Sequence, residues 1–386
     1  MRVVKKYGGS SVATIKQIEN IARYIKNQKN SEIVIVLSAR GKTTNKLTEL
    51  AKQINKNPSK REIDQLISTG ENLSISQMVL MLEKLGVPAI SLTGFQAGIF
   101  TNEVFGKAFI TKIDTSRIES ELKKGKVVVV AGFQGISPNG EITTLGRGGS
   151  DTTAVALASA LNCPCEIYTD VDSVKTVSPE YHKNAKSLHK VTYDEMMEMA
   201  VSGAKVLETR CVELAKKFDV PLFLGKTLGE NKELGSFILH KDYLEKMPIK
   251  NISVRDEQVK FEILNKTDNL SKVFELIQNM NLNLEMFNIF NNKISFICPK
   301  SEFKNAKKEF EKRQIFCKTM QNLAKITLVG LGMATHTNIC NTLTKALKTQ
   351  NIKFYALVVT EISISFLINK KDKEKAVSYL AQLFGL

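Results

Sequence analysis

The segment Gly146–Thr153, which reads GRGGSDTT, combines residue types that suit anion chemistry. It lies between an expected strand at Val127–Ala131 and an apolar helical run at Ala154–Leu161. Glycines let backbone N–H groups approach a ligand closely, a helix start favours anions, and Arg147 adds a guanidinium. Asp151 places a carboxylate beside them. The pattern predicts an anion site next to a carboxylate, although the glycines alone would also fit a surface turn.

A second glycine turn lies near the N-terminus, after an expected strand at residues 2–6. The apolar residues that follow the turn repeat at helical spacing: Val12, Ile15, Ile18, Ile21, Ala22 and Ile25. Gly8 and Gly9 can bring backbone donors close to phosphate oxygens, and Ser10 or Ser11 can cap the helix. Lys6, at the end of the strand, can reach a phosphate. A plain strand-to-helix turn with a solvated lysine is the alternative.

Two further segments repeat the order of strand, small-residue turn and helix. The apolar strand at 33–37 is followed by SARGKTT at 38–44, but this is not a P-loop, because Val36 stands where the first glycine is required. Hydroxyls and a lysine after a strand still fit a ligand crevice in an α/β sheet. Glu71 follows Ser-Thr-Gly at an expected helix start, where it either binds a ligand or only complements the helix dipole.

Taken in order, these motifs resemble those of the aspartate kinase family. The matching segments are KYGGSS at 6–11, SARGKTTN at 38–45, STGE at 68–71, GFQG at 132–135, TLGRGGSDTTA at 144–154, IYTDVD at 167–172 and GAKVL at 203–207. The resemblance implies Mg-ATP-dependent phosphorylation of the β-carboxylate of L-aspartate to 4-phospho-L-aspartate. That reaction is the first step of lysine, threonine and methionine biosynthesis.

The resemblance also implies a role for each matching residue. Lys6 and Asp151 are expected to be catalytic. Arg147 is expected to bind the α-carboxylate of aspartate and Glu71 its α-ammonium, with help from Thr44, Phe133 and Ser150. Nucleotide binding is expected from Gly8, Gly9, Ser10, Thr169, Asp170, Lys175 and Lys205. No residue is expected to bind a metal directly, because Mg²⁺ is carried by the ATP. Positioning and positive charge are what phosphoryl transfer mainly needs.

The sequence departs from the family pattern in two places. Where the family continues Gly-Val-Tyr-Thr-x-Asp-Pro-Arg, residues 173–180 read SVKTVSPE. Lys175 therefore replaces an aromatic residue on the nucleotide side, Ser178 replaces an aspartate, and Glu180 replaces an arginine. Reversal of a charge near phosphates is expected to weaken ATP binding. Glu208 stands where the family usually has histidine.

The C-terminal part contains an internal repeat. NLNL at 281–284 and ISFI at 294–297 recur seventy positions later as NIKF at 351–354 and ISFL at 364–367. Each copy predicts a strand (Val259–Leu264; Ile326–Val329), a helix (Leu270–Met280; Ile339–Thr349), two more strands and a final helix (Phe303–Lys312; Lys373–Leu383). This part resembles the paired ACT domains of many aspartate kinases.

The expected fold is therefore an α/β three-layer sandwich with a largely parallel central sheet, of the amino-acid-kinase type, plus two ferredoxin-like βαββαβ units. Residues 1–240 are expected to form the catalytic domain, 241–324 a linker with the first ACT-like unit, and 325–386 the second unit. In the family a strand near 249–254 completes the second unit.

The family commonly forms homodimers or larger homo-oligomers and binds lysine or threonine at the ACT interface. Both are expected here. Use of the repeat for dimerisation alone stays open, because Asp268-Asn269 and Thr337-Asn338 replace the Pro-Gly pairs that favour close approach of a ligand.

Composition limits the other function classes. The formal charge of +16 raises nucleic acid as a partner, but only nine of the 55 basic residues are arginine and the lysines are dispersed. No signal peptide or membrane-length apolar run is apparent, so a cytoplasmic enzyme is expected. Six cysteines without a CxxC pair indicate neither zinc nor disulfides. The alternatives are another carboxylate kinase of this fold and a weakly catalytic, effector-binding paralogue.

Overall fold

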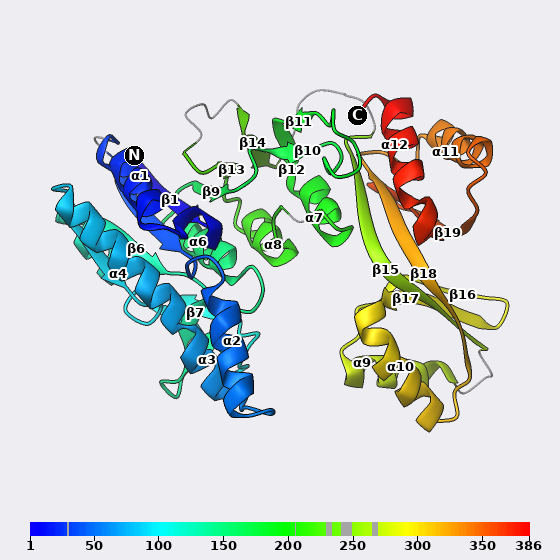
Figure 1. The fold of residues 1–386 in the computed structure, drawn as a ribbon, viewed down its shortest axis with the longest axis horizontal. Helices are drawn as coiled ribbons and strands as arrows, with labels where there is room; N and C mark the ends of the chain where they lie inside the picture. The colour runs from blue at the N-terminus through cyan, green and yellow to red at the C-terminus, as the bar shows by residue number, and fades with distance from the viewer. Residues whose placement is uncertain (29–30, 205, 229–233, 241–248, 265–268) are drawn as a thin grey trace. The chain divides into compact units, whose positions relative to one another are not determined.

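The computed structural model describes residues 1–28, 31–204, 206–228, 234–240, 249–264 and 269–386 (Figure 1). The chain divides into two compact units, each with its own sheets and core. Unit 1 comprises residues 1–174, 187–200 and 205–244. Unit 2 comprises residues 175–186, 201–204 and 245–386.

Unit 1 is built around an eight-stranded sheet. Its strands are, in spatial order, β12 (Lys190–Thr192), β14 (Ser236–Leu239), β13 (Leu222–Lys226), β9 (Cys165–Thr169), β1 (Arg2–Tyr7), β2 (Glu32–Leu37), β6 (Val127–Ala131) and β3 (Ala89–Leu92). Within the described residues, neighbours run parallel except β13 and β14. The apolar sequences of β2 and β6, IVIVL and VVVVA, are typical of parallel strands that are covered on both faces. The predicted largely parallel sheet is confirmed.

Helices cover both faces of this sheet. On one face α1 (Ile15–Lys26) and α4 (Thr69–Lys84) pack against β1 and β2 in a core that includes Ile18, Ile35 and Met78. On the other, α6 (Gly149–Ala160) contacts β1, β2 and β9, and α8 (Thr209–Lys217) packs on α6. Because side chains alternate along a strand, neighbouring residues of β1 face different helices.

A smaller four-stranded sheet leads into the glycine-rich segment. Its order is β5 (Ile110–Ile113), β4 (Ile99–Thr101), β7 (Gln134–Ile136) and β8 (Ile142–Thr144). Helix α3 (Lys60–Ile67) packs on β8. The remaining described elements between residues 1 and 240 are the 3₁₀ helix η1 (Gly9–Val12), α2 (Thr43–Ile54), α5 (Ser116–Lys123), α7 (Tyr193–Val201) and the paired short strands β10 (Val174–Lys175) and β11 (Ser187–Leu188).

Unit 2 has a six-stranded antiparallel sheet. The strand order is β16 (Glu285–Phe290), β17 (Lys293–Pro299), β15 (Asn251–Leu264), β18 (Cys317–Val329), β20 (Ser363–Asn369) and β19 (Phe354–Val359). The helical elements are α9 (Asn269–Met280), α10 (Lys300–Lys312), α11 (Thr337–Thr349), the 3₁₀ helix η3 (Lys370–Asp372) and α12 (Lys373–Phe384). Phe261, Phe296 and Phe310 lie in one core, and Ile326 and Phe366 lie in the other.

The two repeats share strands β15 and β18. Residues 251–255 of β15 pair with 325–329 of β18, whereas 258–263 pair with both β17 and the first half of β18. The register shifts between these halves, where Glu257 and Asn322 adopt left-handed backbone conformations with φ of 55° and 57°. The expected boundary at residues 324 and 325 therefore falls inside one continuous strand.

Residues 175–186 belong to unit 2 and not to the catalytic part in which they were expected. Val177 is fully buried in the core that contains Ile326, and the Ile252 amide donates to the Thr176 carbonyl at 2.8 Å. The Asn251 side chain donates to the Lys175 carbonyl at 3.0 Å. Unit 2 therefore begins, in part, well before residue 241. Residues 241–248, next to the expected boundary, lie outside the described residues.

None of the helices in the described ranges combines the length and apolarity needed to cross a bilayer. All six cysteines are free thiols, four of them buried. Burial raises the pKa of the Cys163 thiol to about 11 and that of Cys298 to about 12. These thiols therefore act as small packing groups.

Val177→Ala is expected to destabilise unit 2 by about 2 kcal/mol, because it removes buried methyl groups and leaves a cavity. Faster hydrogen exchange in β15 and β18, measured by mass spectrometry, would show the loss. The matched control is Val171→Ala, since Val171 is 39% exposed. Unchanged protection in Val177→Ala would contradict the packing of this segment into unit 2.

Candidate functional site

Five parallel strands of unit 1 end in one row. Ala131, Leu37, Tyr7, Tyr168 and Gly225 are register partners across β6, β2, β1, β9 and β13. Each strand is followed at once by a loop, so the polar loops gather at the carboxyl edge of the sheet. That edge is where ligands bind in open α/β sheets.

The two residues expected to be catalytic meet at this edge. Lys6 comes from the end of β1, and Asp151 from the first turn of α6. The Lys6 Nζ atom lies 2.6 Å from Oδ1 of Asp151, and only 8% of Lys6 is exposed. A buried ammonium needs such a partner. The pair holds the Lys6 ammonium at the start of a helix, where an anion is also favoured.

The glycine turn after β1 lies against this ammonium. A Cβ atom at Gly8 would lie 3.6 Å from Nζ of Lys6, and a Cβ atom at Gly9 would clash with the Ala39 carbonyl oxygen. Only glycine fits at position 9. Ser10 is exposed in η1. The turn thus lies beside a positive charge, which suits a phosphate, and the Gly8 amide itself donates to the Tyr168 carbonyl at 3.3 Å.

Thr169 is the last residue of β9, and Asp170 follows it. The Thr169 hydroxyl donates to Asp170 at 2.8 Å, and Asp170 is exposed. Thr227 connects the end of β9 to the glycine turn. Its amide donates to the Thr169 carbonyl at 3.0 Å, and its hydroxyl lies 2.5 Å from that of Ser11. These expected nucleotide residues therefore share one neighbourhood with Gly8.

Two other expected nucleotide residues do not belong to the described part of unit 1. Lys175 is half-buried and belongs to unit 2, as does the exposed Glu180. Lys205 lies outside the described residues. Their roles at the nucleotide, and the expected effect of Glu180, stay predictions.

Glu71 is a buried carboxylate in the first turn of α4, 3% exposed. Its Oε1 atom accepts from the Ala39 amide at 3.0 Å, while Oε2 has no hydrogen-bond partner among the described residues. Burial raises the pKa of Glu71 to about 7. An acceptor left unsatisfied in this way suits a ligand cation.

Thr44 is half-buried in the first turn of α2. The start of α2 lies close to the start of α4, because a Cβ atom at Gly70 would lie 3.4 Å from Cγ2 of Thr43, the residue before Thr44.

Phe133, in the loop after β6, and Ser150, in the first turn of α6, lie where the loop packs closely against the helix. Phe133 has a φ of 71°, and its amide donates to the Thr153 hydroxyl at 3.0 Å. Ser150 is buried, with its Oγ atom 2.7 Å from where a Cβ of Gly132 would lie. The loop after β6 and the start of α6 are therefore in direct contact.

Arg147 lies apart from the buried groups, with 83% of its side chain exposed. Its Nε atom is 2.9 Å from Oε1 of Glu208. The expected carboxylate-binding residue is thus already paired with a carboxylate of unit 1.

The sequence did not single out two residues that fix the glycine-rich loop. Asp64 is fully buried and accepts from the Gly106 amide and from the amide and hydroxyl of Thr144, each at 2.8 Å. Arg210 donates to the Leu145 carbonyl at 2.9 Å. Neither residue lies in a recognisable pattern, because both act through contacts that are distant in sequence.

The sequence also did not single out Lys5, a buried lysine in β1. It is 1% exposed and forms an ion pair with Glu166 of β9, which also accepts from the Tyr168 hydroxyl at 2.8 Å. A lysine inside an otherwise buried strand signals such a pair. The contact joins β1 to β9 on the face opposite to Lys6.

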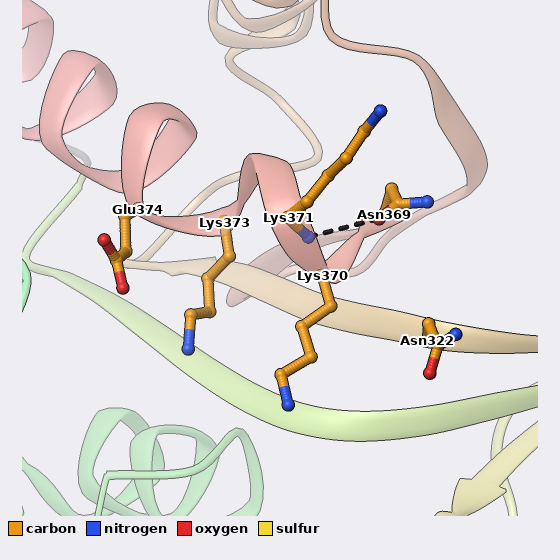
Figure 2. A pocket seen from close by; sticks show the side chains of 6 residues that line it. All are labelled: Asn322, Asn369, Lys370, Lys371, Lys373 and Glu374. Carbon is orange, nitrogen blue, oxygen red and sulfur yellow. Dashed lines mark hydrogen bonds between the residues drawn. The ribbon is translucent and has the colours of Figure 1, made fainter.

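Unit 2 contains a separate pocket of about 480 Å³, shown in Figure 2. It is lined by Asn322, Asn369, Lys370, Lys371, Lys373 and Glu374. Lys370 pairs with Glu257 and Lys373 pairs with Asp256 at 2.6 Å, so carboxylates of β15 neutralise two of its charges. The pocket holds none of the expected site residues and marks the junction of the two repeats.

Glu71→Gln is expected to stabilise the protein increasingly as the pH rises from 5 to 8. The raised pKa means that the folded state favours the neutral carboxyl of Glu71. The wild-type protein therefore loses stability as this carboxyl ionises, when the pH rises through about 7, whereas the glutamine variant has no such group. The gain relative to the wild-type protein should grow by on the order of 2 kcal/mol over that interval. Urea unfolding at several pH values measures it, with the exposed Glu49→Gln as control. Parallel pH curves for Glu71→Gln and the wild type would contradict the burial effect.

Comparison with known proteins gives the same picture for both parts of the chain. Residues 1–226 match the amino acid kinase family, and residues 326–384 match an ACT domain. The chain is 39% identical to an aspartokinase of Geobacillus stearothermophilus, over 100% of this chain and 97% of that protein. It is 40% identical to aspartokinase 2 of Bacillus subtilis, over 100% of this chain and 98% of that protein.

Solved structures resemble the fold of the whole chain. E. coli aspartokinase III in complex with aspartate and ADP, in the R-state, superposes with a TM-score of 0.86 at 22% identity, over 99% of each chain. The same enzyme with lysine and aspartate, in the T-state, gives a TM-score of 0.79. The sequence relationships extend over the full length, and so this chain belongs to the aspartokinase family.

Proposed function

We propose that this protein is an aspartate kinase, which transfers the γ-phosphoryl group of ATP to the β-carboxylate of L-aspartate. The observation that carries the proposal is the buried pair of Lys6 and Asp151 at the carboxyl edge of the sheet. It occurs in a chain whose whole length matches proteins named aspartokinase. The product, 4-phospho-L-aspartate, leads to lysine, threonine and methionine.

Lys6 acts as the charge-stabilising group in this proposal. Negative charge shifts toward the bridging oxygen and the transferring phosphoryl group, and a fixed ammonium lowers the energy of that state. Asp151 orients the ammonium at 2.6 Å. Mg²⁺ is assigned to the nucleotide and not to protein side chains. Bound in that way, Mg²⁺ supplies further positive charge to the phosphates.

Substrate recognition needs a cation and an anion, because aspartate carries an ammonium and two carboxylates. We assign the α-carboxylate to Arg147 and the α-ammonium to Glu71. The unpartnered Oε2 atom of Glu71 supports this assignment, since a bound ammonium would satisfy it. The remaining contacts are assigned to Thr44, Phe133 and Ser150.

The nucleotide is assigned to the glycine turn and the loop after β9. The steric limits at Gly9 and the closeness of Gly8 to Lys6 support a phosphate position there. The residues proposed for this site are Gly8, Gly9, Ser10, Thr169, Asp170, Lys175 and Lys205. ADP in the structure of E. coli aspartokinase III supports nucleotide use by this fold.

Unit 2 is assigned to regulation and assembly. An ACT domain matches residues 326–384, and E. coli aspartokinase III has been solved in complex with lysine. We therefore assign lysine or threonine as the effector class, a homo-oligomer as the assembly and the cytoplasm as the location. Unit 1 is the catalytic domain in this assignment.

The proposed activity is tested by trapping the acyl phosphate with hydroxylamine in the presence of ATP and Mg²⁺. L-aspartate should give product, whereas glutamate and acetylglutamate should not. Product with acetylglutamate or glutamate instead would favour another carboxylate kinase. Absence of product with every acceptor would favour an effector-binding paralogue.

Lys6→Ala should lower kcat by about a hundredfold or more, because it removes a cation that acts mainly in the transition state. The same hydroxylamine assay measures the loss, and circular dichroism checks the fold. Lys16→Ala, at an exposed position of α1, is the control. Full activity in Lys6→Ala would remove the basis for the assigned mechanism.

Arg147→Lys should lower kcat/KM for aspartate by at least about tenfold, since a point charge cannot make two parallel hydrogen bonds to a carboxylate. The KM for ATP should change little. Steady-state kinetics with each substrate varied separate the two effects. Unchanged aspartate kinetics would rule out Arg147 as the α-carboxylate ligand.

A further inference from the structure

The ion pair between Arg147 and Glu208 places a side-chain carboxylate on the guanidinium that the proposed function assigns to the substrate. Nε of Arg147 lies 2.9 Å from Oε1 of Glu208. Both groups reach solvent, with 83% and 39% of their side chains exposed. The pair is therefore open to exchange with a dissolved carboxylate.

Gly148 leaves the space that the Glu208 side chain occupies. Its φ is 66°, and a Cβ atom there would clash with Cγ of Glu208 and lie 3.4 Å from the carboxyl carbon. The glutamate side chain thus lies directly on the backbone of Gly148, which precedes the first residue of α6. The carboxylate is kept close to a helix start, where negative charge is favoured.

Among the described residues, the charged partner of the Glu208 side chain is Arg147. It precedes the first residue of α8, but its side chain makes no capping hydrogen bond there. Its carboxylate is instead directed to Arg147. The two features that attract a carboxylate at this point, a guanidinium and a helix start, are both next to Glu208.

We propose that Glu208 is a tethered competitor for Arg147, which the α-carboxylate of aspartate has to displace when it binds. This inference rests on the proposed function. Glu208 would then be a specificity-determining residue that raises the KM for aspartate without acting in the chemical step. An exposed ion pair changes affinity only modestly, so the expected effect is about two- to fivefold.

The test is Glu208→Gln, which keeps the shape of the side chain and removes its charge. The KM for aspartate should fall about two- to fivefold, while kcat and the KM for ATP stay unchanged. The difference from the wild type should shrink at about 0.5 M salt, because exposed charges are screened. Glu213→Gln, which removes an exposed carboxylate from α8, should show no such change.

A higher KM in Glu208→Gln would overturn the inference, because it would make Glu208 a positioning residue for Arg147. An unchanged KM, or an equal fall in Glu213→Gln, would overturn it as well. Calorimetric binding of L-aspartate to the full chain gives a reading that does not depend on turnover. Tighter binding to Glu208→Gln supports the inference even if no acyl phosphate forms, in which case only the proposed function fails. Glu208→Ala provides a second variant if Glu208→Gln does not fold.

Discussion

The common end point of the central parallel strands is the constraint on which the site depends. Because β6, β2, β1, β9 and β13 are parallel and in register, Ala131, Leu37, Tyr7, Tyr168 and Gly225 form one row. Loops that are more than 100 residues apart in sequence therefore start side by side. A slip of one residue in any of these strands would turn its last side chain to the other face of the sheet.

Alternation along β1 gives its two neighbouring lysines different environments. Lys5 points to the face covered by α1, where it lies 5.6 Å from the ring centres of Tyr24 and Tyr168 and pairs with Glu166. Lys6 points to α6 and pairs with Asp151. Each buried ammonium is stabilised by its own carboxylate. The first pair ties two strands together, whereas the second lies at the edge where a ligand can reach it.

In unit 2, strands β15 and β18 run through both repeats. The register shifts around Glu257 and Asn322 let each strand serve both repeats. The carboxylate of Glu257 binds Lys300 of the first repeat and Lys370 of the second, so charge as well as backbone pairing joins them. Glu285 similarly binds Arg255 and Lys325.

The sequence by itself determined the alternation of strands, glycine turns and helices, the parallel sheet and the repeat, because each follows from local periodicity and turn chemistry. It also pointed to Lys6, Glu71 and Asp151, since their motifs stand at strand ends and helix starts. Only the tertiary structure decided that Glu208 reaches Arg147, and that residues 175–186 pack into unit 2. Such contacts join segments far apart along the chain, and local sequence patterns carry no information about which distant surfaces meet.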